Sequence, residues 1–216
     1  MSDLILHNYF RSSTSIRVRV ALNLKGLDYH YASYALLDKE HKSDDYLTIN
    51  PQGLVPSLQI SPDKILGQSL AIVEYLNDEY PDPPLLPTDP WGRARVRSMA
   101  LMVACEIHPL NNLSVLNTLR SEFGAGDQAV KNWFANWVHQ TFSALESKLV
   151  NESESGLFCH GDTPTLADIC LYAQVINNQR FDVDMERYPG ISEVYARCEG
   201  VAAFANAHPS KQPDAF

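Results

Sequence analysis

Apolar positions recur along the chain in two rhythms, and the change between them divides the sequence in two. In about the first eighty residues, short apolar runs of strand length alternate with segments whose apolar residues return every three or four positions. This pattern predicts the order strand, helix, strand, helix, strand, strand, helix. After residue 88 the helical spacing continues almost throughout, for example at Val96, Met99, Val103 and Ile107. We therefore expect an α/β domain followed by an all-helical domain.

Local signals place several of these elements. Apolar residues 4–6 and the alternating aromatic residues 29–34 suit strands, and residues 57–60 and 64–66 flank a turn signal of hairpin type. Ile16, Val20 and Leu24 share one helical face, and Lys25-Gly26 ends that helix. Between the two halves, four prolines fall within residues 81–87. Proline at this density excludes a helix interior and predicts a stiff linker, so we expect domains at residues 1–82 and 88–216.

Hydroxyl side chains crowd the start of the first predicted helix. Ser12, Ser13, Thr14 and Ser15 follow Arg11 directly. Backbone N–H groups point outward at a helix N-terminus, and the helix dipole favours an anion there. A thiolate is such an anion, and these surroundings lower the pKa of a thiol. The simpler alternative is that one hydroxyl only caps the helix.

Two further turns accompany this one. Residues 50–58 form a turn into a strand that starts near Val55-Pro56, and residues 67–76 form a turn into a second helix. We expect Gln68 and Ser69 at the N-terminus of that helix, with Ser69 as its N-cap and Leu70 as its first residue.

Taken together, these segments resemble the thioredoxin-like domain of soluble glutathione transferases. The run from Arg11 to Gly26 resembles the zeta class in particular, and so does the run from Ile107 to Leu116, with Asn-Leu-Ser-Val-Leu at its end. The resemblance covers essentially the whole chain. It implies a thioredoxin-like α/β N-terminal domain, an all-α C-terminal domain, glutathione as cofactor, and a cis peptide bond between Val55 and Pro56.

The resemblance also implies roles for individual residues. Ser12, with Thr14 as the second candidate, would stabilise the glutathione thiolate. Zeta-class enzymes commonly have cysteine where this chain has Thr14, so a thiol nucleophile at this position is excluded. The positions that match glutathione contacts of the family are Ser12, Ser13, Thr14, His41, Gln52, Val55, Pro56, Gln68, Ser69, His108, Asn112 and Ser114.

Two arginines point to the substrate. Arg180 matches a zeta-class arginine of the substrate cleft, and Arg11 lies at the lip of the glutathione site. A guanidinium binds a carboxylate through two parallel hydrogen bonds, so two of them suit a dicarboxylate. The resemblance implies cis–trans isomerisation of maleylacetoacetate to fumarylacetoacetate, a step of tyrosine catabolism. Isomerisation of maleylpyruvate, broader transferase or dehalogenase activity, and a non-enzymatic glutathione-binding module stay as alternatives.

Composition narrows the remaining possibilities. A net charge of −9 argues against a general nucleic-acid binder. We expect no signal peptide, no membrane segment and no metal site, and a cytoplasmic location.

Cys105 and Cys170 fall in apolar helical patterns and are expected in the core. Residues 165–168 fit a helix capping box, which gives Asp168 a structural role outside the active site. The resemblance implies a homodimer, to which Arg93, Arg95 and Arg97 add weak support.

Overall fold

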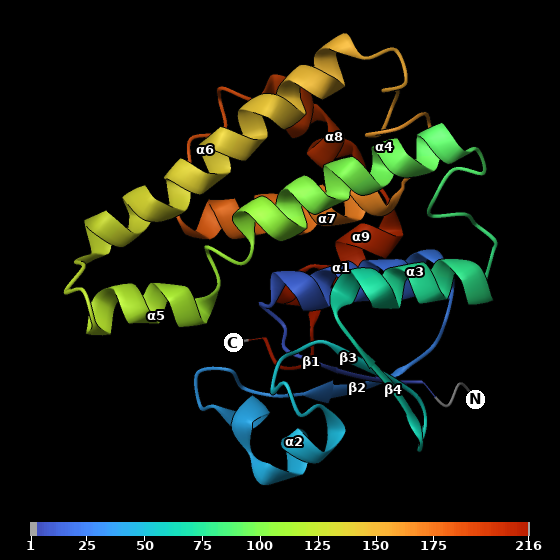
Figure 1. Ribbon diagram of the computed structural model, residues 1–216. Helices are drawn as coiled ribbons and strands as arrows, with labels where there is room; N and C mark the ends of the chain where they lie inside the picture. Colours follow the sequence, from blue (N-terminus) through green and yellow to red (C-terminus); the bar gives the residue numbers. More distant parts are fainter. Residues whose placement is uncertain (1–3, 216) are drawn as a thin grey trace. The chain divides into compact units, whose positions relative to one another are not determined.

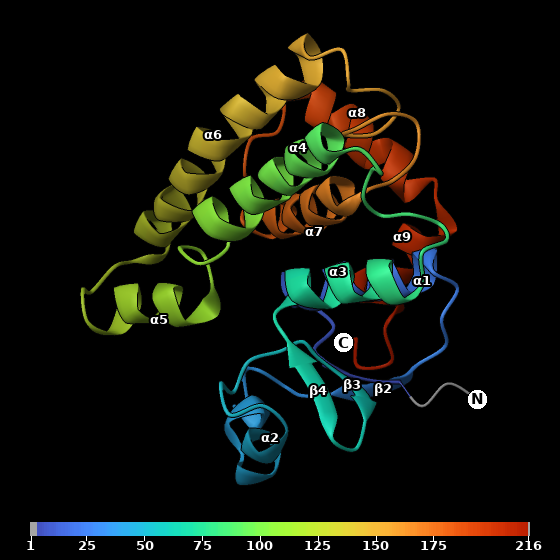
Figure 2. The ribbon, with the colours of Figure 1, turned by 45° about the vertical axis from the view of Figure 1, so that its right-hand side comes forward.

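The computed structural model describes residues 4–215 and forms two compact units (Figures 1 and 2). One unit comprises Met1–Leu85 and Glu199–Phe216, and the other comprises Leu86–Cys198. The division after Leu85 falls within the proline-rich segment. The segment from Glu199 onward, which we assigned to the helical domain, packs with the first unit instead.

A four-stranded mixed sheet organises the first unit. Its strands are β1 (Ile5–Asn8), β2 (His30–Ser33), β3 (Ser57–Ser61) and β4 (Lys64–Gly67), in the order β2-β1-β3-β4. The β1–β2 pair is parallel and the other two pairs are antiparallel. The remaining elements are α1 (Ser13–Leu24), η1 (Glu40–Lys42), α2 (Asp44–Ile49), α3 (Ser69–Glu79), α9 (Ala202–Ala207) and η3 (Pro209–Lys211). The predicted order of strands and helices is confirmed, and both ribbon views show α1 and α3 on the face of the sheet opposite α2.

The end of the chain fastens the turn that precedes α1. The guanidinium of Arg19 is fully buried and donates to the carbonyl oxygens of Ala207 (3.1 Å) and Phe10 (2.8 Å). The carboxylate of Asp214 accepts from the Phe10 backbone N–H (3.2 Å) and from the Tyr31 hydroxyl (2.5 Å). These contacts explain why the last segment belongs to the first unit. They also fix the backbone just ahead of Ser12.

The second unit is helical. Its elements are α4 (Pro90–Leu101), the π-helical segment η2 (Met102–Ile107), α5 (Leu113–Ser121), α6 (Asp127–Asn151), α7 (Leu166–Arg180) and α8 (Pro189–Glu199). Helix α7 is buried along almost its whole length and packs against α4 and η2. None of the described helices is both long and apolar enough to span a membrane.

The capping box of α7 is confirmed. Asp168 is fully buried, and its carboxylate accepts from the backbone N–H groups of Cys159 (2.7 Å) and Thr165 (2.8 Å) and from the Thr165 hydroxyl (2.9 Å). Burial raises the pKa of Asp168, and these hydrogen bonds oppose the rise. The carboxylate thus joins the loop before α7 to the first turn of the helix.

We expect Asp168→Ala to destabilise the protein by about 3 kcal/mol, because two buried N–H groups and a hydroxyl lose their acceptor. Chemical denaturation measures the change. The matched control is Asp127→Ala, since Asp127 is also in the first turn of a helix but its side chain is 90% exposed. Equal unfolding free energies for the two variants would show that the capping contacts contribute little.

Two expectations about the second unit are wrong. Cys170 is buried as expected, but Cys105 is exposed. The π-helical winding of η2 keeps Val103 and Ile107 inside and turns Cys105 outward. Pro109 falls within a helical stretch of the sequence, which predicts a kinked helix there. In the structure the helical run stops before Pro109, and α5 begins separately at Leu113.

Charged side chains serve the fold as well as the surface. Arg95, one of the three arginines taken as weak support for a dimer, is buried and donates to Glu152 (2.8 Å) and to the Cys159 carbonyl (2.8 Å). Its guanidinium is therefore used inside the second unit.

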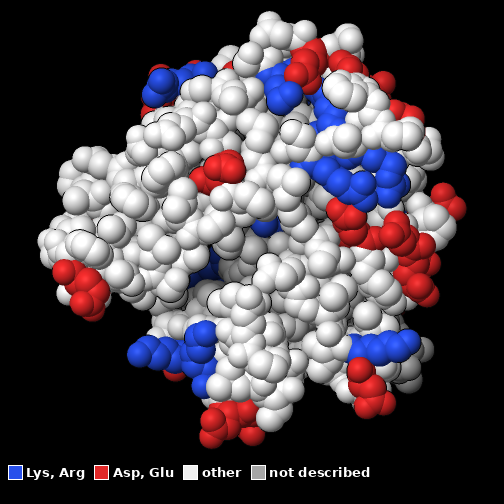
Figure 3. All heavy atoms as spheres, viewed as in Figure 1, with Lys and Arg blue, Asp and Glu red and all other residues white. Residues whose placement is uncertain are grey.

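On the face seen in Figure 3, Lys and Arg side chains lie in small groups, several of them beside Asp or Glu.

Candidate functional site

Ser12 is the N-cap of α1, and its hydroxyl belongs to a short chain of hydrogen bonds. Its backbone is extended (φ −69°, ψ 118°), and its oxygen accepts from the Ser15 N–H. The Ser12 and Thr14 hydroxyls lie 2.9 Å apart, and Thr14 donates to the Val55 carbonyl oxygen (3.1 Å). The proton of Thr14 is therefore engaged, while that of Ser12 can turn from Thr14 to an incoming anion. This geometry favours Ser12 over Thr14 as a donor. Ser13 is the first residue of α1 and is buried.

Polar contacts from helix α2 and the residue that follows it stabilise the turn before β3. The Val55–Pro56 peptide bond is cis, as the resemblance implied. The Leu54 carbonyl accepts from the Tyr46 hydroxyl (2.6 Å) and the Asn50 amide (2.9 Å). The Val55 backbone N–H donates to no group among residues 4–215. An extended peptide could therefore pair with the Val55 backbone by strand addition.

Gln68 and Ser69 form a second, adjacent feature of the same unit. Helix α3 begins at Ser69 rather than Leu70, so Ser69 is not its N-cap and Gln68 holds that position. Gln68 has φ 65° and ψ 109°, a region in which a non-glycine residue is strained by about 1–3 kcal/mol. Its amide donates to the Gln52 side-chain oxygen (2.9 Å). This side-chain hydrogen bond joins two of the predicted glutathione contacts, Gln52 and Gln68.

The backbone at His41 lies close to Gly53, the residue that follows Gln52. The φ of Gly53 is +59°, and a Cβ there would meet the Lys42 ammonium at 2.8 Å and the His41 carbonyl at 3.1 Å. Glycine is therefore required for this close approach. Burial, with the charge of Lys42 second, lowers the pKa of His41, which favours a neutral imidazole at pH 7. Its Nδ1 atom is buried and has no partner among the described residues.

The predicted contacts of the helical unit gather at the start of α5 and the end of α7. Asn112 caps α5 and accepts from the Val115 N–H (3.1 Å) and the Ser114 hydroxyl (2.6 Å), and His108 follows η2. Arg180 is the exposed last residue of α7, where it donates to the Asn177 side chain (3.2 Å). These four belong to the second unit, whereas all the other predicted site residues belong to the first.

Arg11 directly precedes Ser12, in the turn before α1. Its guanidinium donates to the Tyr9 hydroxyl at 3.0 Å and lies over the Phe10 ring, 5.0 Å from the ring centroid. These contacts keep the guanidinium beside the turn that carries Ser12. The first unit thus places a positive charge close to the Ser12 hydroxyl in the chain.

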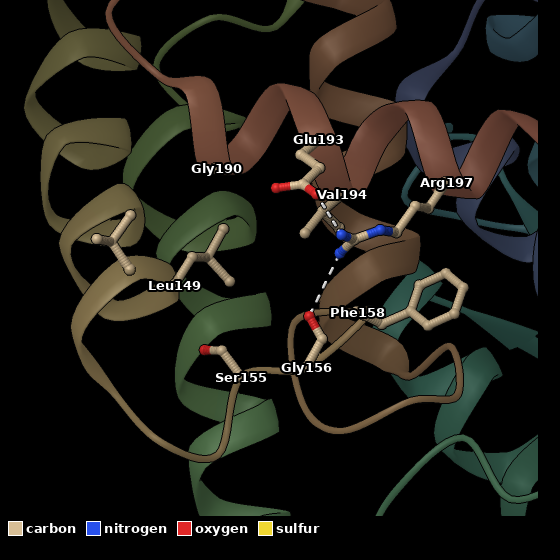
Figure 4. A pocket seen from close by; sticks show the side chains of 9 residues that line it. Leu149, Ser155, Gly156, Phe158, Gly190, Glu193, Val194 and Arg197 are labelled. Carbon is tan, nitrogen blue, oxygen red and sulfur yellow. Dashed lines mark hydrogen bonds and ion pairs between the residues drawn. The ribbon is translucent and has the colours of Figure 1, made fainter.

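A cavity of about 170 Å³ lies elsewhere, in the second unit (Figure 4). Residues of α6, the following loop and α8 line it, and Arg197 contacts Glu193 and donates to the Gly156 carbonyl (3.4 Å). The cavity contains none of the predicted site residues. Because its two charged residues contact each other, we assign it no chemistry.

Arg17, a buried residue that contacts Ser69, was not identified from the sequence. Arg17 is 1% exposed and donates to the Ser69 hydroxyl (3.3 Å). In the sequence, Arg17 and Arg19 alternate with Ile16, Val18 and Val20. Charged residues within so apolar a helix were a signal that the helix is buried on every side.

Comparison with known proteins agrees with this geometry. The N-terminal domain profile of the glutathione S-transferases matches residues 6–84. A maleylpyruvate isomerase from Ralstonia is 46% identical over 97% of this chain and 98% of its own length. A maleylacetoacetate isomerase from Pseudomonas aeruginosa is 44% identical over 97% of each chain.

Two solved structures are also similar over nearly their full lengths. One is a bacterial maleylpyruvate isomerase described as a zeta-class glutathione S-transferase, with a TM-score of 0.96, 45% identity, and coverage of 98% of this chain and 100% of that one. The other is a maleylacetoacetate isomerase from Methylobacterium extorquens with bound malonate and glutathione, with a TM-score of 0.94, 37% identity, and coverage of 98% and 99%. The protein belongs to the zeta class of the glutathione transferase family.

Proposed function

We propose that this protein is a glutathione-dependent cis–trans isomerase that converts maleylacetoacetate to fumarylacetoacetate. The observation that carries the proposal is the Ser12 hydroxyl, which caps α1 and has a proton free to turn toward an anion beside the cis Val55–Pro56 turn. The Val55 backbone N–H and the buried Nε and Nη2 atoms of Arg17, none of which has a partner among residues 4–215, fit a tripeptide that carries carboxylates.

Bound glutathione supplies a thiolate, whose reversible addition to a cis double bond allows rotation about that bond. The residues of this chain provide the conditions for it. Ser12 donates a hydrogen bond to the sulfur, and the dipole of α1 favours the anion, so both keep the thiol pKa low. Val55 pairs with the cysteinyl backbone. Gln52, Gln68 and Ser69 hold the γ-glutamyl end. His41, Ser13, His108, Asn112 and Ser114 complete the proposed contacts.

The two arginines select the substrate. We assign Arg11 and Arg180 to the two carboxylates and to the negative charge that develops next to them. The malonate in the Methylobacterium extorquens structure supports a dicarboxylate, since it is one itself. Thr14 has no thiol, so all sulfur chemistry belongs to glutathione.

The relatives leave a second substrate open. The Ralstonia relative is named a maleylpyruvate isomerase, and the same thiolate chemistry would isomerise maleylpyruvate. Parallel assays of kcat/KM with both maleyl substrates test the choice. We expect maleylacetoacetate to be preferred, because the Asn-Leu-Ser-Val-Leu run at Asn112 resembles isomerases of that substrate. A preference for maleylpyruvate would reassign the substrate, and activity with neither, alongside conjugation of apolar electrophiles, would favour a general transferase.

We also propose a cytoplasmic homodimer, the assembly common in this family. Sedimentation equilibrium at micromolar concentration should give about twice the 24.2 kDa of one chain. Because Arg95 is buried within the second unit, we do not assign it a contact in the dimer interface. A mass of one chain at that concentration would contradict the dimer.

A further inference from the structure

Arg17 is a buried cation with unused hydrogen-bond donors. Its side chain is among the largest that are fully buried, and its Nη1 atom donates to the Ser69 hydroxyl oxygen at 3.3 Å. Its Nε and Nη2 atoms are buried and have no partner among the described residues. None of the ion pairs within residues 4–215 includes Arg17.

The other buried arginines show how different this is. Arg19 donates to three backbone carbonyls and to Asn8, and Arg95 pairs with Glu152 and also donates to the Cys159 carbonyl. Those guanidinium groups are compensated by the protein itself. Burying a charge without a partner is unfavourable. Of the three buried arginines, Arg17 is therefore the one whose burial an external anion would compensate.

The place where the anion would bind follows from Ser69. Its oxygen accepts from Arg17, so its hydroxyl hydrogen points away from the guanidinium, and it donates to no group among residues 4–215. Ser69 is also the first residue of α3, and the first helical bond runs from the Ile72 N–H to the Gln68 carbonyl. The N–H groups of residues 69–71 therefore have no partner within the helix and favour a carboxylate.

We propose that Arg17 is a positioning residue for the α-carboxylate of the γ-glutamyl group. It turns the Ser69 hydroxyl proton toward the carboxylate and places an uncompensated positive charge behind it. This inference rests on the proposed use of glutathione. It adds a buried charge to a site otherwise made of neutral side chains and backbone N–H groups.

Calorimetric titration with two ligands tests the proposal without measuring turnover. One ligand is glutathione, and the other is 4-aminobutyryl-cysteinyl-glycine, which lacks only the α-carboxylate of the γ-glutamyl group. In Arg17→Met we expect the Kd of glutathione to rise about thirtyfold, the scale of a hydrogen bond to a charged group, and the Kd of the analogue to rise less than threefold. Equal losses for both ligands, as expected of a purely structural residue, would overturn the proposal.

Arg17→Lys provides a variant that keeps the charge if Arg17→Met does not fold. A lysine should restore most of the preference for glutathione over the analogue, because the charge remains while the Ser69 contact is altered. A Lys variant that binds both ligands with the same Kd would contradict a role for the charge. The parent protein separates the two levels of inference. If it binds no glutathione, the proposed function fails as well; if it binds glutathione and the analogue equally, only the role of Arg17 fails.

Discussion

Replacing Ser12 with alanine should lower isomerase turnover by about a hundredfold, the effect of removing one preorganised donor to an anion. The Ser12 hydroxyl is the N-cap of α1, and its proton is free to turn while that of Thr14 is engaged by Val55. The pKa of bound glutathione should rise, and its Kd should change much less. Thiolate absorbance, titrated against pH in the glutathione complex, measures the pKa.

Two variants make this test specific. Ser61→Ala removes a hydroxyl at the far end of β3 and should leave the thiolate pKa unchanged. Thr14→Val should have a smaller effect than Ser12→Ala, because it loosens the contact to Val55 without removing the donor. An unchanged thiolate pKa in Ser12→Ala, with a raised one in Thr14→Val, would transfer the role to Thr14.

Replacing Arg180 with alanine should cost about 1.5–3 kcal/mol in transition-state binding of the maleyl substrate, the scale of a hydrogen bond to a charged group. Arg180 is the exposed last residue of α7, where its guanidinium donates to the Asn177 side chain and lies over the Phe181 ring, and we assign it to a carboxylate of the substrate. Steady-state kinetics give the loss in kcat/KM. The affinity for glutathione should barely change, since its proposed clamp is formed by Gln52, Val55, Gln68 and Ser69.

The matched control is Arg187→Ala. Arg187 is also an exposed arginine of the second unit and lies over the ring of Tyr188. Its loss should leave kcat/KM unchanged. If Arg180→Ala isomerises maleylacetoacetate as well as the parent protein does, the argument for a carboxylate pocket fails.

Periodicity was enough to predict the order of the elements, because each element of the sheet unit carries its own local signal. Gly26, with φ +64°, ends α1, and the hairpin turn separates β3 from β4 as expected. Polar contacts between residues far apart in the chain have no such local signal in the sequence. The return of residues 199–216 to the first unit depends on Arg19 and Asp214, which meet partners about two hundred residues away in the sequence.

The site shows the same limit. The hydroxyls before α1 and the turn at Val55 could be found from the sequence, since both lie at element boundaries. The start of α3 was misplaced by one residue, because Gln68 takes a positive φ that its residue type does not favour. Arg17 was missed because an arginine on a short helix ordinarily faces water, and only the packing of α1 against α3 and α9 shows that this one does not.

The central claim is that this protein isomerises a maleyl substrate with glutathione regenerated in each turnover. The direct measurement follows maleylacetoacetate and glutathione together in one reaction with a large excess of substrate over glutathione. The account predicts that fumarylacetoacetate forms through many turnovers per glutathione, that all glutathione is recovered, and that the reaction stops when glutathione is removed. Product formation without glutathione, or loss of one glutathione per substrate converted, would contradict it.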